Sequence, residues 1–191
     1  MANIIDVNYF VGQIAIPFDN VDPDEFTSTY IAVYEREILI RFLGYDLYKR
    51  FTEGLAQPSP AQIWLDLRDG VEYTVDVNSV SHLIKWNGLA NSDKVSLIAY
   101  YVYYKWLSQN DTQVTGTGVG RSTKENAEIY DPNFKLVQAW NNVLELSGLN
   151  WYPKTEPTLY NFINDNKETY LPDEFDPWIF KPIEPANFLG I

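Results

Sequence analysis

The chain contains no cysteine and only one histidine, His82, among its 191 residues. Without cysteine, neither a disulfide framework nor a thiolate zinc site can form. A transition-metal site would also need several imidazole or thiolate ligands, and a single histidine does not supply them. We therefore expect no bound metal and no cofactor.

Positive charge is scarce as well. The chain has 14 lysines and arginines against 26 aspartates and glutamates, which gives a formal net charge of -12. Because tight binding to a phosphate backbone depends on cationic contacts, ordinary nucleic-acid binding is not expected. An acidic surface still lets DNA slide past, since like charges repel.

Long apolar runs are also missing. No run approaches the length of a membrane span, and the first residues lack the basic and apolar segments of an export signal. We expect a soluble protein that is cytoplasmic at synthesis and does not contact membranes. With 46% hydrophobic content, the chain can bury one proper core, so one main globular body is expected.

Aromatic residues are abundant: the chain has 14 tyrosines, 10 phenylalanines and 6 tryptophans. This is more large amphipathic surface than one small core commonly needs. Because tyrosine and tryptophan are enriched at protein interfaces, part of this surface is expected to contact partners.

The clearest helix start is at Asp22. The sequence places Asp22 as an N-cap, Pro23 at the first helical position and Glu25 at the third, which is a variant of the capping box. Apolar residues before Asp22 show no sustained period. Residues 1–21 are therefore interpreted as an extended N-terminal arm that can dock on the body.

Two rows of apolar residues at spacings of four follow, and they predict one long helix with a wide apolar face. Its charged residues, Glu35 among them, are expected mostly on the opposite face. Gly44 is expected to kink this helix, because glycine is unfavourable in a helix interior. Ser59 and Pro60 repeat the capping pattern and predict a short helix that ends at Gly70.

Alternation of apolar and polar residues over residues 71–86 predicts a small β-hairpin, the only convincing sheet signal in the sequence. Ser92 and Asp93 are then expected to open a helix. Residues 95–107 are apolar or aromatic nearly all round, so this helix should be buried at the centre of a bundle. Residues 109–128 are polar and glycine-rich, and predict a long interhelical loop.

A last long helix is expected from Pro132 to Gly148, and a short one at residues 157–166. Four prolines between residues 172 and 185 rule out a helix there and predict an extended tail on the body or on a neighbour. The predicted fold is mainly α: a bundle of three to four main helices with one small β-hairpin, a long interhelical loop and an extended C-terminal tail. The predicted parts are the arm at 1–21, the helical domain at 22–150 and the tail region at 151–191.

Three chemical interpretations stay open beside a purely structural one. His82 lies on the apolar face of the hairpin and is interpreted as a structural or interface histidine, since no partner for general-base catalysis can be placed. Asp66, Asp69 and Glu72 could form an acid-pair hydrolase site, although an acidic chain produces such pairs by chance. The tyrosines of residues 100–104 could bind a small ligand, but they more often pack in a core.

The glycine-rich loop does not fit a nucleotide-binding fingerprint. It lacks the P-loop lysine, has Thr115 where the leading glycine belongs, and follows a helix instead of a strand. Its glycines are interpreted as permitting positive φ or close approach to another backbone. Valines and basic residues beside these glycines favour a loop that binds a partner.

The predicted partner-binding residues therefore lie in this loop and in the C-terminal tail, where aromatic side chains would anchor an intersubunit contact. No catalytic and no metal-binding residue is assigned. The partner-binding residues are Val114, Thr115, Gly116, Gly118, Val119, Gly120, Arg121 and Lys124 in the loop, and Phe175, Trp178, Phe180 and Phe188 in the tail.

The order of these motifs resembles the head-to-tail connector (adaptor or neck) proteins of tailed bacteriophages, with the greatest similarity to those of Bacteroides phages and the crAss-like group. The resemblance covers about residues 22–147. It rests on a Tyr-Glu-Arg-Glu-Ile-Leu run at residues 34–39, a Phe-Leu-Gly-Tyr-Asp-Leu-Tyr run at 42–48, the Trp64 helix, the hairpin, the tyrosine-rich helix and the glycine loop.

The resemblance implies a non-enzymatic virion protein that forms a ring of about twelve copies under the capsid portal. Its partners would be further copies of itself, the portal protein, and tail or further neck proteins. Genomic DNA would pass through the ring without specific binding. The protein would reside in the head-tail neck of the virion, and in the host cytoplasm during assembly. A tail-completion protein, which would bind the tail tube instead of the portal, is the nearest alternative.

Overall fold

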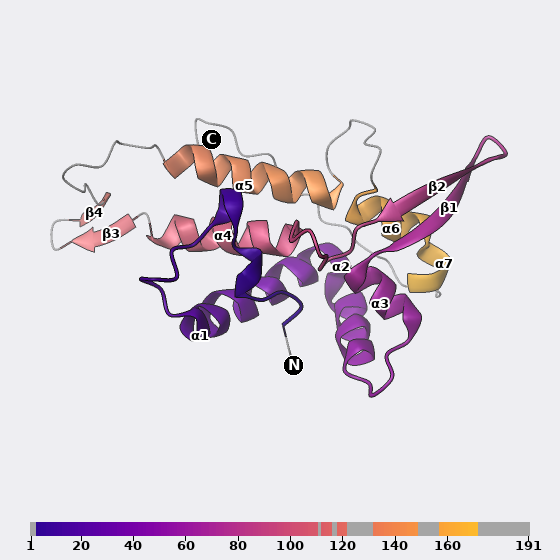
Figure 1. Cartoon of the computed structure of the whole chain (residues 1–191), viewed down its shortest axis with the longest axis horizontal. Helices are drawn as coiled ribbons and strands as arrows, with labels where there is room; N and C mark the ends of the chain where they lie inside the picture. The colour runs from indigo at the N-terminus through magenta and orange to yellow at the C-terminus, as the bar shows by residue number, and fades with distance from the viewer. Residues whose placement is uncertain (1–2, 111, 116–117, 122–131, 149–156, 172–191) are drawn as a thin grey trace.

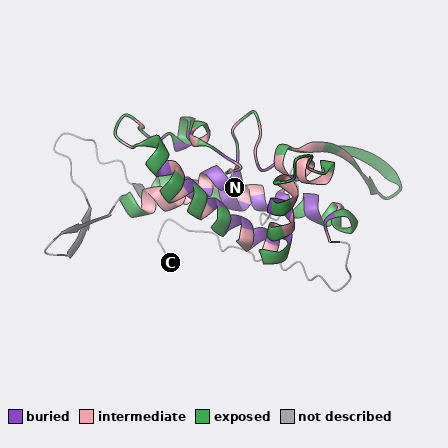
Figure 2. Ribbon diagram, turned by 90° about the horizontal axis from the view of Figure 1, so that it is seen from below, coloured by how far each residue is buried: buried purple, intermediate pink, exposed green. Residues whose placement is uncertain are grey.

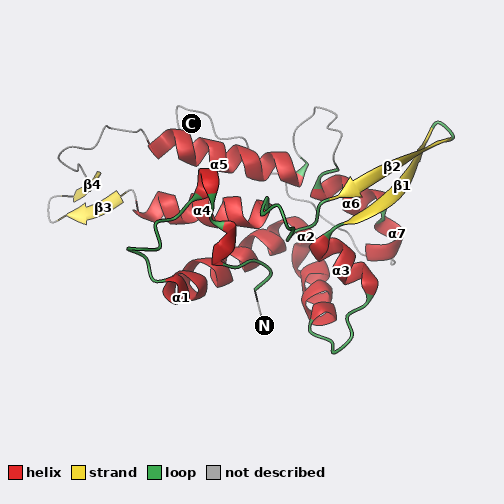
Figure 3. Ribbon diagram, viewed as in Figure 1, coloured by secondary structure: helices red, strands yellow, loops and turns green. Residues whose placement is uncertain are grey.

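The computed structural model describes residues 3–110, 112–115, 118–121, 132–148 and 157–171. This part of the chain is mainly helical, as the sequence predicts, with an antiparallel β-hairpin towards each end of the longest axis (Figure 1 and Figure 3). The bundle consists of α2 (Ala32–Leu55), α4 (Leu97–Asn110) and α5 (Pro132–Ser147). Helix α4 is central, because it contacts both α2 and α5.

Helix α1 (Pro23–Phe26) begins where the sequence predicts. The Asp22 carboxylate accepts hydrogen bonds from the backbone N–H groups of Asp24 and Glu25, at 2.8 and 2.9 Å. It thereby satisfies two of the donors that every helix start leaves free. A π-helical turn, Thr27–Ile31, then continues α1 into α2.

Gly44 divides α2 into two halves. Its backbone (φ 75°, ψ 162°) lies in a region that is essentially restricted to glycine. The two halves run in different directions, and the second half lies beside α3 (Gln62–Asp69) (Figure 1). The predicted kink is confirmed.

The start of α3 differs from the prediction, which placed the cap at Ser59. Ala61 is the N-cap, and its extended backbone (φ -64°, ψ 145°) delays helical geometry until Gln62. Ser59 is therefore too far upstream to accept a hydrogen bond from the first turn. The predicted end is confirmed, since Gly70 (φ 94°) donates its N–H to the carbonyl of Asp66 at 3.0 Å.

Strands β1 (Val71–Val77) and β2 (Val80–Trp86) form the predicted hairpin. The register pairs Val71 with Trp86 and Val77 with Val80. Asn78 and Ser79 form the turn with positive φ angles of 52° and 65°. Two consecutive residues of positive φ define a type I′ turn, whose twist matches that of the strands.

Helix α4 begins later than predicted. The sequence placed its cap at Ser92 or Asp93, whereas Ser96 Oγ accepts the backbone N–H of Ile98 at 3.2 Å and has the capping role. The reason is the backbone of Lys94, whose φ of 58° is incompatible with a helix at that point.

The predicted loop between α4 and α5 contains a second antiparallel ladder, formed by β3 (Thr112–Thr115) and β4 (Gly118–Arg121). Its register pairs Thr115 with Gly118 and Thr112 with Arg121. The sequence analysis missed this ladder because two of the four residues of β4 are glycine. Glycine is depleted in strands and weakens the sequence signal for them.

Helix α5 begins at Pro132 and is followed by Gly148 (φ 111°), as predicted. The predicted short helix is α6 (Leu159–Asp165), which Thr158 caps by accepting the N–H of Asn161 at 3.3 Å. The sequence analysis did not foresee α7 (Lys167–Tyr170), which follows directly. The predicted extended tail at residues 172–191 lies outside the described residues.

The N-terminal arm packs on the bundle. Two 3-10 turns, Val7–Tyr9 and Gly12–Ile14, interrupt its extended course. The ring of Phe10 meets the ring of Phe26 edge to face, with centroids 4.9 Å apart. The arm thus contributes to the core, through four buried side chains: Ile5, Phe10, Ile14 and Ile16.

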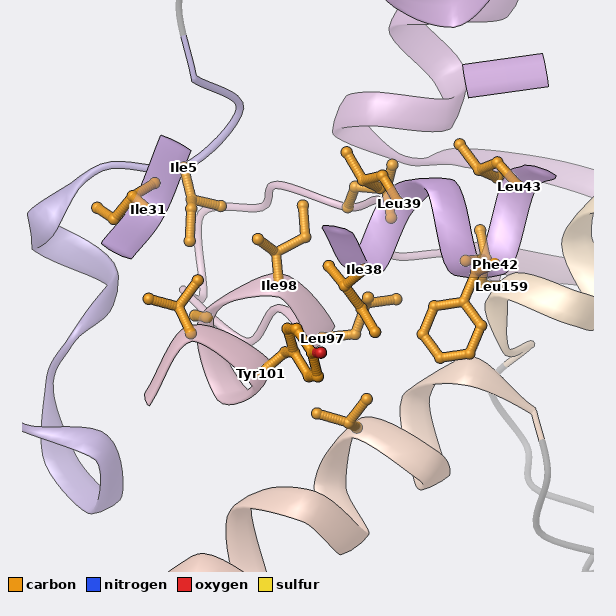
Figure 4. Packing of buried hydrophobic residues seen from close by; sticks show 14 of the residues in the cluster. Ile5, Ile31, Ile38, Leu39, Phe42, Leu43, Leu97, Ile98, Tyr101 and Leu159 are labelled. Carbon is orange, nitrogen blue, oxygen red and sulfur yellow. The ribbon is translucent and has the colours of Figure 1, made fainter. Parts of the chain in front are cut away.

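One hydrophobic core joins the arm, α2, α4, α5 and α6. Burial of each large apolar side chain contributes about 1.5–3 kcal/mol, so this core fixes the relative positions of the elements that lead to the two hairpins. Buried residues lie mainly along the bundle, while the outer part of the β1–β2 hairpin is exposed (Figure 2). The core residues labelled in Figure 4 are Ile5, Ile31, Ile38, Leu39, Phe42, Leu43, Leu97, Ile98, Tyr101 and Leu159.

Candidate interaction surfaces

The predicted partner-binding residues fall into two groups. One group lies outside the described residues: Gly116, Lys124, Phe175, Trp178, Phe180 and Phe188. The other group lies in the second hairpin, with Val114 and Thr115 on β3 and with Gly118, Val119, Gly120 and Arg121 on β4.

The β3–β4 hairpin extends beyond the bundle at one end of the longest axis, where β3 follows closely on α4 (Figure 1). Within the part of the chain that the structure describes, β4 pairs only with β3. The register leaves two residues between Thr115 and Gly118, and residue pairs in such a hairpin alternate between hydrogen-bonded and non-hydrogen-bonded. The backbone groups of Val119 and Arg121 therefore point away from β3, towards an edge of β4 that no other described strand covers.

The β1–β2 hairpin extends at the opposite end, and its base is anchored (Figure 1). The Trp86 ring is 4% exposed and stacks on Phe162 of α6, with centroids 5.2 Å apart. Trp86 Nε1–H also donates to the carbonyl of Leu67 at 3.2 Å. On β1, the Tyr73 hydroxyl donates to Asp165 at 3.1 Å. Burial, together with the Asp165 carboxylate, raises the pKa of Tyr73, so its hydroxyl keeps the proton it donates.

The outer half of this hairpin is exposed (Figure 2). Val80 and Leu83 leave 56% and 71% of their surfaces accessible. Successive residues of a strand alternate between its faces, so these two side chains lie on opposite faces of the ribbon. They do not form one contiguous apolar patch, and single exposed apolar side chains are common on protein surfaces.

His82 lies exposed on the same ribbon, opposite Val75 in the ladder. The hydrolase candidates make local contacts. Asp69 accepts two hydrogen bonds from Arg68, both at 2.7 Å, and Asp66 accepts one from Gln62 at 2.7 Å. Glu72, the third candidate, is exposed on β1.

The tyrosines of α4 contribute to helix packing. Tyr101 is 1% exposed and donates its hydroxyl proton to Glu37 of α2 at 2.5 Å. Lys105 Nζ lies 3.0 Å from the same carboxylate and 5.2 Å from the centre of the Tyr34 ring. Partial burial alone would raise the pKa of Glu37, but the hydrogen bonds from Tyr101 and Lys105 outweigh it and hold the pKa below its ordinary value. These contacts join α2 to α4.

A cavity of about 530 Å³ lies between the arm and α2, and Glu35 lines it. The sequence predicted Glu35 on the polar face of the helix, whereas in the structure only 8% of its surface is exposed. The Glu35 carboxylate accepts the backbone N–H groups of Ile4 and Ile5 at 2.9–3.1 Å and thereby holds the arm. Burial raises the pKa of Glu35 to about 7, although these hydrogen bonds act in the opposite direction.

A second cavity, of about 300 Å³, lies where β2, α4 and α5 meet. Its polar lining includes Asn91, Asp93, Glu145 and Thr158. Among the described residues, no group of three or more histidine, cysteine, aspartate or glutamate side chains could hold a metal ion. In the same part of the chain, no helix has the length and apolar character needed to cross a membrane.

Comparison with protein-family models, with curated proteins and with solved structures found no match for this chain. Its function must be inferred from its own residues and geometry.

Proposed function

We propose that the chain is a structural protein of the neck of a tailed-phage virion, where copies form a ring that joins the portal to the tail and lets DNA pass. The observation that carries this proposal is the placement of two different hairpins at opposite ends of one packed body (Figure 1). Among the residues that the structure describes, the strands of each hairpin pair only with each other. A closed ring repeats one heterologous contact, so each copy must offer two different, complementary surfaces.

The body between the hairpins suits this role. The core links α2, α4 and α5 with the docked arm, so the elements that lead to the two hairpins keep defined relative positions. A heterologous contact closes into a ring only if every copy presents its two surfaces at the same angle. A packed core supplies that constancy, because native interiors resist deformation.

The charge of the chain supports a DNA conduit. With a formal net charge of -12, each copy carries overall the same sign of charge as the DNA backbone. Repulsion would let DNA move through the lumen without adhering to it. The sequence resemblance to phage connectors supports the same assignment.

Mass measurement of the purified chain, alone and with its portal protein, tests the proposal. We expect a closed ring of about twelve copies on the portal, visible by electron microscopy. A strict monomer that ignores portal and tail proteins at high concentration would contradict it. A parallel pulldown with tail-tube protein is the control for the alternative, since a tail-completion protein would bind the tube and not the portal.

A further inference from the structure

We propose that neighbouring copies join by an intermolecular β-sheet, in which the β4 edge of one copy pairs antiparallel with the β1 edge of the next. This inference rests on the proposed ring and specifies its contact. Each two-stranded hairpin would become half of a four-stranded sheet. Isolated two-stranded hairpins are marginally stable in water, whereas larger sheets are stable, so the pairing would stabilise both partners.

Within the described ranges, neither the β1 edge nor the β4 edge pairs with a further strand. The backbone groups of residues 72–76 form no hydrogen bonds with segments outside their hairpin, among the residues that the structure describes. Because the pair Val77–Val80 closes a two-residue turn, the outward-pointing backbone groups of β1 belong to Glu72, Thr74 and Asp76. On β4 they belong to Val119 and Arg121, which have the same two-residue spacing.

A copy cannot make this pairing with itself, because its two hairpins lie at opposite ends of the longest axis (Figure 1). The edge of one copy must therefore meet the edge of another. The same arrangement makes the contact head to tail, as the proposed ring requires.

Charge selects the β1 edge over the β2 edge. The outward positions of β1 include two exposed carboxylates, Glu72 and Asp76, while those of β2 include Lys85. β4 ends in Arg121, one of only 14 cationic residues in the chain. Opposite charges directly across two strands stabilise a sheet, and like charges destabilise it.

Charge also selects the register. Antiparallel pairing of the outward positions allows Val119 to face either Thr74 or Asp76. In the first register Arg121 faces Glu72, while in the second Arg121 faces Thr74 and a valine faces a carboxylate. The first register places the positive charge of Arg121 opposite the negative charge of Glu72. We therefore propose that Val119 pairs with Thr74 and that Arg121 pairs with Glu72.

Introduced cysteines test this register directly, because the chain contains none of its own. The double variant Thr74→Cys with Val119→Cys should form disulfides between neighbouring copies under assembly conditions, since residues paired across strands lie within disulfide range. Non-reducing gels should then show a ladder of covalent oligomers up to the full ring. The matched control, Leu83→Cys with Val119→Cys, moves the first cysteine to the exposed β2 edge and should give no ladder.

Charge exchange provides a second, independent test. Glu72→Arg or Arg121→Glu alone should weaken self-association about tenfold, because each puts like charges opposite one another. The double exchange should restore association, and restoration shows that the single variants are folded. Lys85→Glu, on the β2 edge, is the control and should leave association unchanged.

The outcomes separate this inference from the proposed function. The chain could form rings while the Thr74→Cys, Val119→Cys variant gives no covalent oligomers and the double charge exchange does not restore association. That result would overturn the sheet contact and leave the proposed ring standing. Covalent oligomers from the Leu83→Cys, Val119→Cys variant, and none from the Thr74→Cys, Val119→Cys variant, would also overturn the sheet contact. A wild-type chain that remains monomeric with its portal would overturn the ring, and the contact with it.

Discussion

The two hairpins of this protein are built in different ways. β1–β2 has strands of seven residues, a type I′ turn and a base that packs on α6 through Trp86 and Tyr73. β3–β4 has strands of four residues, and Gly118 and Gly120 make up half of β4. Glycine loses more conformational freedom on ordering than any other residue. The first hairpin is therefore anchored to the core at its base, and the second contains a strand that loses more backbone entropy when it is ordered.

This difference between the hairpins indicates that they have different roles in the proposed contact. A pre-organised edge reduces the entropy that is lost on binding. The anchored β1–β2 hairpin would be the acceptor, and the glycine-containing β4 strand would be the segment that adds to it.

Loss of the anchor should have the largest effect. Phe162 is 1% exposed and contacts the rings of Trp86, Tyr73 and Tyr170. We expect Phe162→Ala to lower the free energy of unfolding by about 3–5 kcal/mol, because it leaves a cavity beneath the hairpin. Chemical denaturation measures this, and hydrogen exchange should show faster opening of β1 and β2.

Asn164→Ala is the matched control, since it truncates an exposed residue of the same helix. It should change stability by about 0.5 kcal/mol or less. If Phe162→Ala and Asn164→Ala had equal effects, the base of β1–β2 would not be anchored through α6, and the contrast between the hairpins would fail.

The sequence predicts the anchored end better than the other. Alternation over residues 71–86 and glycine at position 70 are local signals, and the structure confirms both. The β3–β4 ladder has no such signal, because its glycines read as a loop. Of the predicted site, Arg121 and Val119 lie on a strand whose edge matters for the proposed contact, whereas nothing in the sequence distinguishes the β1 edge as their partner.

The role of Glu35 was also missed, for a physical reason. Helical periodicity places a glutamate among charged neighbours, but the arm folds back over α2 and buries it. Contacts between segments some 31 residues apart depend on tertiary structure, which local patterns do not report. The burial of Tyr101 was predicted more easily, because a helix that is apolar or aromatic nearly all round is buried on most sides.

The body that separates the hairpins should show a pH dependence due to Glu35. Its pKa is about 7 in the folded protein and 4.5 ordinarily. Between these values the folded chain holds a proton that the unfolded chain has released, so stability falls as pH rises. The stabilisation is complete below pH 4.5, and about 3 kcal/mol is lost by pH values above 7.

Glu35→Gln removes the ionisation while keeping a side-chain acceptor for Ile4 and Ile5. Denaturation of both proteins between pH 4.5 and 8 should give curves that diverge over this window, with the variant losing less stability as pH rises. Parallel curves would show that folding does not raise the pKa of Glu35. The other titrating groups are common to both proteins and cancel in the difference.

Close packing at the start of β1 gives a smaller effect. A Cβ at Gly70 would lie 2.4 Å from the carbonyl oxygen of Trp86, and Gly70 has a φ of 94°. We expect Gly70→Ala to lower stability by about 2 kcal/mol and to loosen the hairpin base. Gly12→Ala is the control: Gly12 also has positive φ (61°) but open space around it. It should lose only about 1 kcal/mol. If both variants lost the same stability, the close approach of Gly70 to β2 would not contribute to the effect of Gly70→Ala.

The turn of β1–β2 should allow a small gain. Ser79 has a φ of 65°, which costs a non-glycine residue about 1 kcal/mol. Ser79→Gly should therefore stabilise the hairpin by up to about 1 kcal/mol. Hydrogen exchange at the amides of β1 and β2 should be slower in the variant than in the wild-type protein. Since the β1 edge is already held by Trp86 and Tyr73, ring assembly should change little. A large gain in assembly would instead show that the conformation of the turn limits binding. The β1–β2 hairpin would then be less pre-organised than the packing of its base indicates.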